Sequence, residues 1–223
     1  MYTPAGAAQP GNLVMQFAGE SDRESRLRPL WQFLTDFGDT AVTVPFAVLV
    51  LGFLLAARER RLALGWGLVI FGAASAMAAL KLASTVCGYP FAGAGLASPS
   101  GHSAMSIAVY GGFAAIAGFS LRPPARAALI GTTAILVTGI TASRAIEGYH
   151  TKVEVAIGLA VGLGALGAMI AIAVRHRARR LPLAWLAAGA LVVFALFHGT
   201  RWPAERAIHR LAWWLDILRP LCR

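Results

Sequence analysis

Charged side chains are scarce in this sequence: only 13% of its 223 residues are Asp, Glu, Lys or Arg, whereas 57% are hydrophobic. A water-soluble domain of this size needs a polar exterior that such a composition does not supply. The scarcity argues against a soluble globular protein and predicts an integral membrane protein.

Acidic residues and cysteines are also few. The ten Asp and Glu residues form no cluster of the kind that holds Mg²⁺. Two cysteines, Cys87 and Cys222, are too few and too far apart in sequence to frame a metal site. Free thiols are favoured, and a Cys87–Cys222 pair is the alternative. We expect no metal and no organic cofactor.

Long uncharged runs are what the chain has in quantity. About 20 apolar residues cross the hydrocarbon of a bilayer as a helix, and six runs approach that length. The runs lack the alternation typical of a membrane β-barrel. They predict an all-α protein with six transmembrane helices; a soluble all-α domain is the weaker alternative, because short loops leave no material for a polar exterior. The runs are residues 40–57, 62–86, 103–120, 127–143, 153–174 and 183–198.

We expect three parts: an N-terminal segment (1–37), one six-span domain (38–198) and a C-terminal tail (199–223). Arginines alternate with Leu, Trp and Phe over residues 26–37, which is typical of a helix at the membrane interface. The tail has a similar amphipathic character, with three tryptophans. Both ends are expected to be interfacial anchors rather than binding sites.

The net charge is +10, and nine of the 20 Lys and Arg residues are arginines in alternate loops. The positive-inside rule puts these loops in the cytoplasm, and the other loops and both termini outside, although the basic tail argues the other way. Membrane lipids are the expected partners and nucleic acid is not, because no single groove gathers the arginines. Composition and compact loops indicate a bacterial inner membrane. The loop arginines are Arg58, Arg60, Arg61, Arg122, Arg126, Arg175, Arg177, Arg179 and Arg180.

Two polar islands interrupt the apolar runs: SPSGHSAMS (98–106) and TASRAIEGYHTKVEV (141–155). The order of the spans brings both islands, together with Lys81, to helix ends on one side of the membrane. Ser100, Gly101 and His102 stand at a helix start, where backbone N–H groups favour a phosphate, and Gly101 permits close approach. Lys81 and Arg144 supply fixed positive charge for the same anion.

Two histidines complete this constellation. Glu154 follows His150 by four residues, so on a helix its carboxylate can accept the far ring N–H of His150 and fix its tautomer. His150 is therefore the predicted nucleophile. His102 has no acid within one turn and is the predicted general acid.

The PSGH sequence at 99–102 and the SRAIEGYH sequence at 143–150 resemble the second and third signature motifs of the type 2 phosphatidic acid phosphatase superfamily. The resemblance implies a six-span helical bundle that hydrolyses lipid phosphates. It implies that His150 forms a phosphohistidine and that His102 protonates the leaving group. The phosphate-binding residues would be Lys81, Ser100, Gly101 and Arg144. Glu154 stands where the family most often has Asp.

The first motif of the family departs here. Gly88 and Tyr89 stand where Arg and Pro are usual, so one phosphate-binding cation is absent. Lys152, two residues after His150, is the candidate replacement, with a solvated interfacial charge as its alternative role. A phosphotransferase using the same histidine, or a non-catalytic lipid-phosphate binder or transporter, remain alternatives to a lipid phosphatase. Undecaprenyl diphosphate, phosphatidylglycerol phosphate, phosphatidic acid and lipid A are candidate substrates.

Overall fold

The computed structural model describes residues 27–87, 98–176, 181–202 and 204–214, and this part of the chain is helical with no strand. The prediction of an all-α protein is confirmed for these residues. Most of the N-terminal segment, Gly88 and Tyr89 of the departing motif, and the Cys87–Cys222 pair lie outside the described residues and side chains.

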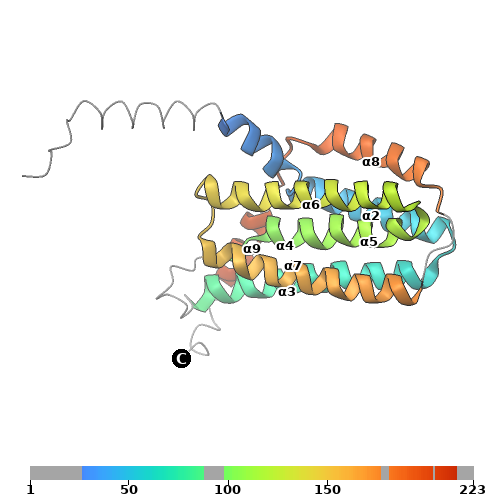
Figure 1. The fold of residues 1–223 in the computed structure, drawn as a ribbon. Coiled ribbons are helices and arrows are strands. Elements are labelled where there is room, and N and C mark those ends of the chain that lie inside the picture. The colour runs from blue at the N-terminus through green and yellow to red at the C-terminus, as the bar shows by residue number, and fades with distance from the viewer. Residues whose placement is uncertain (1–26, 88–97, 177–180, 203, 215–223) are drawn as a thin grey trace, which may run out of the picture.

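Most of the long helices run side by side as a bundle (Figure 1). A helix at residues 27–36 leads into the bundle through a turn at residues 37–39. The elements that follow are α2 (Thr40–Ala56), α3 (Arg60–Cys87), α4 (Gly101–Ser106), a π-helical turn (Ile107–Gly111), α5 (Gly112–Ala117), a 3₁₀ turn (Gly118–Ser120), α6 (Pro123–Ile146), α7 (Lys152–Arg175), α8 (Leu183–Phe197) and α9 (Ala204–Trp214).

Five helices of the described chain are long and apolar enough to cross a membrane. The sixth apolar run forms α8, which has 15 residues. At a rise of 1.5 Å per residue it measures roughly 22 Å, less than the ~30 Å of a hydrocarbon core. The five are Leu27–Ala56, Arg60–Val86, Gly101–Ser120, Pro123–Ile146 and Lys152–Arg175.

The stretch Gly101–Ser120, called the central helix below, is the most enclosed of the five. Its apolar window is 67% buried, compared with 17% for α6 and 22% for α7. Large apolar side chains on other helices are exposed, among them Phe71, Ile135 and Trp185. Many large apolar side chains on the outside of a helical bundle are unusual for a water-soluble protein, and they suit helices whose outer faces contact lipid.

Helix α7 packs very closely on the start of the central helix because the two α7 residues that face it there, Gly158 and Gly162, are glycines. A Cβ atom at Gly158 would lie 2.4 Å from the carbonyl oxygen of Ser100, and one at Gly162 would lie 2.8 Å from that of Ala104. Small residues four apart let two helix backbones approach in a membrane. This approach places the start of α7, which directly follows the third signature sequence, against the second signature sequence.

The turn at residues 37–39 is held against the central helix. The hydroxyl of Tyr110, which lies in the π-helical turn, donates to the carbonyl of Phe37 at 2.6 Å. Farther along α2, the indole N–H of Trp66 donates to the carbonyl of Ala47 at 2.9 Å and joins α2 to α3. These contacts fix the position of Asp39, the N-cap of α2.

Candidate active site

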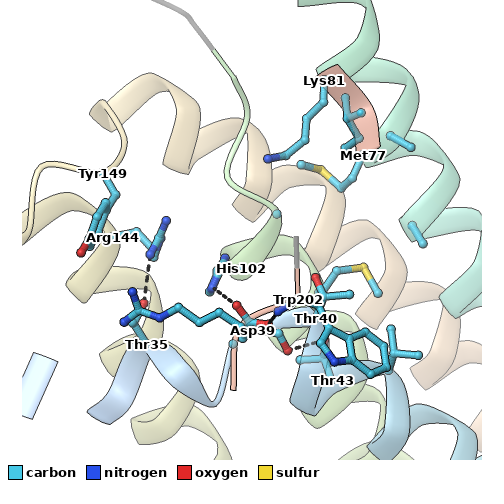
Figure 2. Close-up of a pocket in the computed structure, with 18 of the residues that line it drawn as sticks. Thr35, Asp39, Thr40, Thr43, Met77, Lys81, His102, Arg144, Tyr149 and Trp202 are labelled. Atoms are coloured by element: carbon cyan, nitrogen blue, oxygen red, sulfur yellow. Dashed lines mark hydrogen bonds and ion pairs between the residues drawn. The ribbon is translucent and has the colours of Figure 1, made fainter. Parts of the chain in front are cut away.

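Several helix ends meet at one end of the bundle, called the site end below. The end of α3, the start of α4, the end of α6 and the start of α7 lie there beside α9 (Figure 1). A cavity of about 480 Å³ opens among them. Four residues singled out from the sequence line it: Lys81, Gly101, His102 and Arg144 (Figure 2).

The two cations of this group are largely buried, Lys81 being 8% and Arg144 9% exposed. Arg144 donates from Nη1 to the hydroxyl of Thr35 at 3.2 Å, and its guanidinium carbon lies 4.5 Å from the centre of the Tyr149 ring. The Lys81 side chain reaches the start of α4, where a Cβ added at Gly101 would lie 4.0 Å from Nζ. Partly dehydrated cations attract an anion more strongly than cations in water.

Glu154 joins the two signature sequences. Its Oε1 accepts the backbone N–H of Ser98 at 2.6 Å. Its Oε2 accepts the backbone N–H of Thr151 at 3.0 Å and lies 3.1 Å from Nδ1 of His150. With the Thr151 hydroxyl accepting from the Glu154 N–H, this forms a capping box at the start of α7. The predicted pairing of His150 with Glu154 is present, but the expectation that both residues lie on one helix is wrong, because His150 precedes the extended N-cap Thr151.

The pairing leaves Nε2 as the ring atom of His150 with a free lone pair when Nδ1 carries the proton. Burial lowers the pKa of His150 below its ordinary value of 6.5; the hydrogen bond to Glu154 opposes this shift, and the charges of Arg144 and Lys81 add to it. The neutral, nucleophilic form is therefore favoured near neutral pH. The ring is 6% exposed and is not among the described residues that line the cavity, although its neighbour Tyr149 is.

His102 has a carboxylate partner that the sequence did not reveal. Its Nε2 lies 3.7 Å from Oδ2 of Asp39, which also lines the cavity (Figure 2). The expectation that His102 has no acid within one turn holds for its own helix, but an acid from another segment faces it, because the turn before α2 packs against α4. The signal available in the sequence was a helix N-cap at Asp39, whose Oδ1 accepts the N–H of Ala41 at 2.8 Å.

Two of the five predicted phosphate-binding residues are not among the described residues that line the cavity. Ser100 is fully buried, its backbone N–H donates to the Glu154 carbonyl at 3.1 Å, and its hydroxyl pairs with that of Ser103 at 3.0 Å. Lys152 is exposed as the first residue of α7, and it is not among the described lining residues. Ser100, the N-cap of α4, therefore supports the start of the helix that carries His102, and it is not among the described residues that line the cavity.

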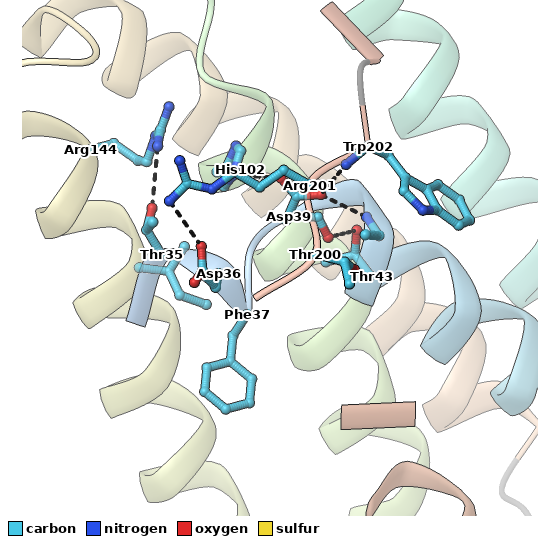
Figure 3. A network of polar contacts seen from close by, with 12 residues as sticks. Thr35, Asp36, Phe37, Asp39, Thr43, His102, Arg144, Thr200, Arg201 and Trp202 are labelled. Carbon is cyan, nitrogen blue, oxygen red and sulfur yellow. Dashed lines mark hydrogen bonds and ion pairs between the residues drawn. The ribbon is translucent and has the colours of Figure 1, made fainter. Parts of the chain in front are cut away.

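The segment after α8 supplies cavity residues that the sequence had assigned to an anchor. Arg201, Trp202, Arg206 and Ile208 all line the cavity. The backbone N–H of Trp202 donates to Oδ1 of Asp39 at 3.4 Å (Figure 3). The first part of the tail is thereby attached to the same carboxylate that faces His102.

The arrangement gathers buried positive charge, a histidine paired with a carboxylate and a second histidine held by Glu154. This set suits binding of an oxyanion and proton transfer beside it. Within residues 27–87, 98–176, 181–202 and 204–214, no three His, Cys, Asp or Glu side chains form a group able to hold a metal ion.

Comparison of the chain with protein-family models, with curated proteins and with solved structures found no match.

Proposed function

We propose that this protein is a membrane lipid phosphatase that hydrolyses a phosphomonoester or diphosphate of a lipid through a phosphohistidine. The observation that carries the proposal is the double role of Glu154, which orients His150 and holds the loop before His102. One carboxylate thereby aligns the two histidines that the family resemblance pairs. The resemblance also underlies our proposal of a six-span bundle in which α8 is the sixth span.

In the proposed reaction the phosphoryl group binds between Lys81 and Arg144. Nε2 of His150 attacks phosphorus, the bond from phosphorus to the lipid oxygen breaks, and His102 gives that oxygen a proton. Asp39 faces Nε2 of His102, so Nδ1 is the nitrogen left for the leaving oxygen. Water then attacks the phosphohistidine, the phosphorus–nitrogen bond breaks, and His102 takes the proton of that water as inorganic phosphate forms.

A lipid is the favoured substrate because the lining of the cavity includes apolar as well as charged side chains. Val44, Met77, Met105 and Ile208 line the cavity together with its cations. A headgroup could therefore contact the cations while the first carbons of an acyl or prenyl chain contact these apolar side chains. The four lipid phosphates named above are the candidate substrates.

We propose that the site end faces the periplasm or outside of a bacterial inner membrane. The end of α2, the start of α3, the end of α7 and the start of α8 lie at the opposite end (Figure 1). Arg58 follows α2 and Arg175 ends α7, and the positive-inside rule favours a cytoplasmic place for the arginines at these helix ends.

A non-catalytic lipid-phosphate binder is the second candidate, favoured by one observation. The ring of His150 is not among the described cavity residues, and attack on phosphorus needs its Nε2 within reach. Binding with no phosphate release, and no phosphoenzyme, would support this candidate.

The test is a phosphate-release assay on purified protein with the four lipid phosphates. We expect release from at least one lipid, and none after His150→Ala. His176→Ala removes a histidine at the end of α7 remote from the cavity and serves as the matched control. Rapid quench with ³²P-labelled lipid should trap an acid-labile phosphoenzyme in the wild type. Label transferred to a second lipid instead of water would identify a phosphotransferase.

A further inference from the structure

The cavity has more positive charge than the two signature sequences supply. Lys81 and Arg144 come from α3 and α6, and Arg201 and Arg206 reach the same cavity from the segment that follows α8. The first family motif has Gly88 in place of its usual arginine, so a third cation would have to come from another part of the chain. The segment that follows α8 places arginines at the cavity.

The chain turns sharply after α8 to bring Arg201 to the cavity. Gly199 has φ of +80°, a backbone conformation that glycine adopts at little cost. The N–H and hydroxyl of Thr200 both donate to the carbonyl of Phe197, at 3.0 and 2.5 Å. Trp202 is then attached to Asp39 at 3.4 Å. Arg201 is thus fixed at its backbone on both sides.

The side chain of Arg201 extends over the cavity from this anchored position. Its Nη2 lies 3.4 Å from Oδ1 of Asp36, and Figure 3 shows the guanidinium between Asp36 and the side chains of His102 and Arg144. The side chain is 59% exposed, so it can rotate away from Asp36 at small cost. A phosphate dianion is a better partner for a guanidinium than one exposed carboxylate, because it offers more charge and two oxygens.

We propose that Arg201 binds the phosphoryl group of the substrate and supplies the cation that is absent at Gly88. This inference rests on the proposed function and deepens it. Asp36 holds Arg201 over the cavity, and an incoming phosphate takes the guanidinium from Asp36. Lys152, the candidate from sequence, does not line the described cavity, whereas Arg201 does.

The first measurement is the inhibition constant of orthovanadate, a phosphate analogue, together with kcat/KM for the best lipid. We expect Arg201→Gln to raise the inhibition constant of orthovanadate and to lower kcat/KM, each by roughly 10- to 100-fold. This is the scale of losing a charge-assisted hydrogen-bonded pair. Arg201→Lys should recover part of the loss, since lysine restores the positive charge but not the two parallel N–H donors of the guanidinium. Arg210→Gln removes one positive charge from α9 at a position that does not line the cavity and should match the wild type. Equal values for Arg201→Gln and the wild type would overturn the proposal.

The Asp36→Asn variant distinguishes a purely structural role of Arg201 from phosphate binding, because it removes the ion pair but keeps the arginine. If Arg201 only ties the segment to Asp36, the two variants lose vanadate affinity equally, and the proposal is wrong. If Arg201 binds phosphate, Asp36→Asn retains or gains affinity while Arg201→Gln loses it. Lys152→Gln in the same series shows whether the sequence candidate contributes instead.

Failure of the proposed function is distinguishable from failure of this inference. If the wild type releases no phosphate from any lipid, hydrolysis is excluded, and direct binding of orthovanadate still decides the role of Arg201. Weaker binding in Arg201→Gln supports it, and unchanged binding overturns it.

Discussion

Oδ2 of Asp39 lies 3.7 Å from Nε2 of His102, and Oδ1 of the same carboxylate accepts the N–H groups of Ala41 and Trp202. One side chain therefore caps α2, holds the C-terminal segment and faces the proposed general acid. Because Asp39 is 8% exposed, its charge acts on His102 with little screening by water.

Asp39→Asn should separate the charge of this residue from its capping role. Asn accepts the N–H of Ala41 as well as Asp does, so the free energy of unfolding should change by less than about 1 kcal/mol. Loss of the carboxylate should weaken the positioning of His102 and lower kcat/KM on a lipid phosphate about tenfold, or ~1.4 kcal/mol. Nitrophenyl phosphate, whose leaving group needs no proton, should be affected much less.

The diagnostic quantity is the ratio of kcat/KM for the lipid phosphate to kcat/KM for nitrophenyl phosphate. His102→Ala should change this ratio in the same direction and by more. An equal loss on both substrates in Asp39→Asn would show that the carboxylate acts on the fold rather than on proton transfer.

The acid limb of the pH profile should report His150. Its nucleophilic form is neutral, so activity falls as pH drops through its pKa in the folded protein. Because burial and two cations lower that pKa, the acid limb of kcat/KM should lie below pH 6.5. Glu154→Gln removes the hydrogen-bonded carboxylate that raises the pKa, and the limb should move to still lower pH.

The measurement is kcat/KM against pH for the wild type and Glu154→Gln, with substrate ionisation measured separately. A limb that moves upward in Glu154→Gln would assign the titration to another group.

Gly158→Ala should destabilise the protein and disrupt the site together. Its Cβ would meet a backbone oxygen of Ser100 at 2.4 Å, so α7 and the loop before α4 must separate. We expect a loss of roughly 1 to 3 kcal/mol, the usual cost of overpacking, and a large fall in phosphate release.

Gly164→Ala is the matched control, since it lies on the same helix with nothing within 4 Å of an added Cβ. It should be neutral or slightly stabilising, because Ala favours a helix over Gly. Thermal unfolding in detergent gives the comparison, and similar midpoints for the two variants would contradict the close packing.

The orientation can be tested from the two ends of α6. Ala145, in its last turn at the site end, and Ala125, in its first turn, are both exposed. With Cys87 and Cys222 replaced by Ser, Ala145→Cys should react with an impermeant maleimide in intact cells. Ala125→Cys should react only after lysis, and the opposite pattern would reverse the proposed topology.

Much of the fold follows from the sequence alone, because membrane helices are dictated locally. Long uncharged runs must satisfy their backbone hydrogen bonds internally, so each of the six predicted runs forms a helix or the greater part of one. Bounds shift by a few residues, as in α6, which extends to Ile146 beyond the expected end at residue 143. The short α8 shows the limit, since composition predicts an apolar helix without fixing its length.

Some features of the candidate site were likewise predictable from the sequence, and others were not. The pairing of His150 with Glu154 was predictable from their spacing along the chain, although the capping box at the start of α7 makes it, because His150 lies before that helix and not on it. The burial of the Ser100 hydroxyl and the contact of Asp39 with His102 were not. Both depend on which helix faces meet, and that is set by close contacts such as Gly158 on Ser100 and Tyr110 on Phe37.

The sequence by itself determined the helices, the spacing of the signature residues and the local His150–Glu154 pair, because each depends on residues that are neighbours along the chain. Only the tertiary structure decided that Asp39 faces His102, that Arg201 reaches the cavity and that Lys152 stays outside its described lining. These relationships join segments far apart in the chain, and no local pattern encodes the packing that brings them together.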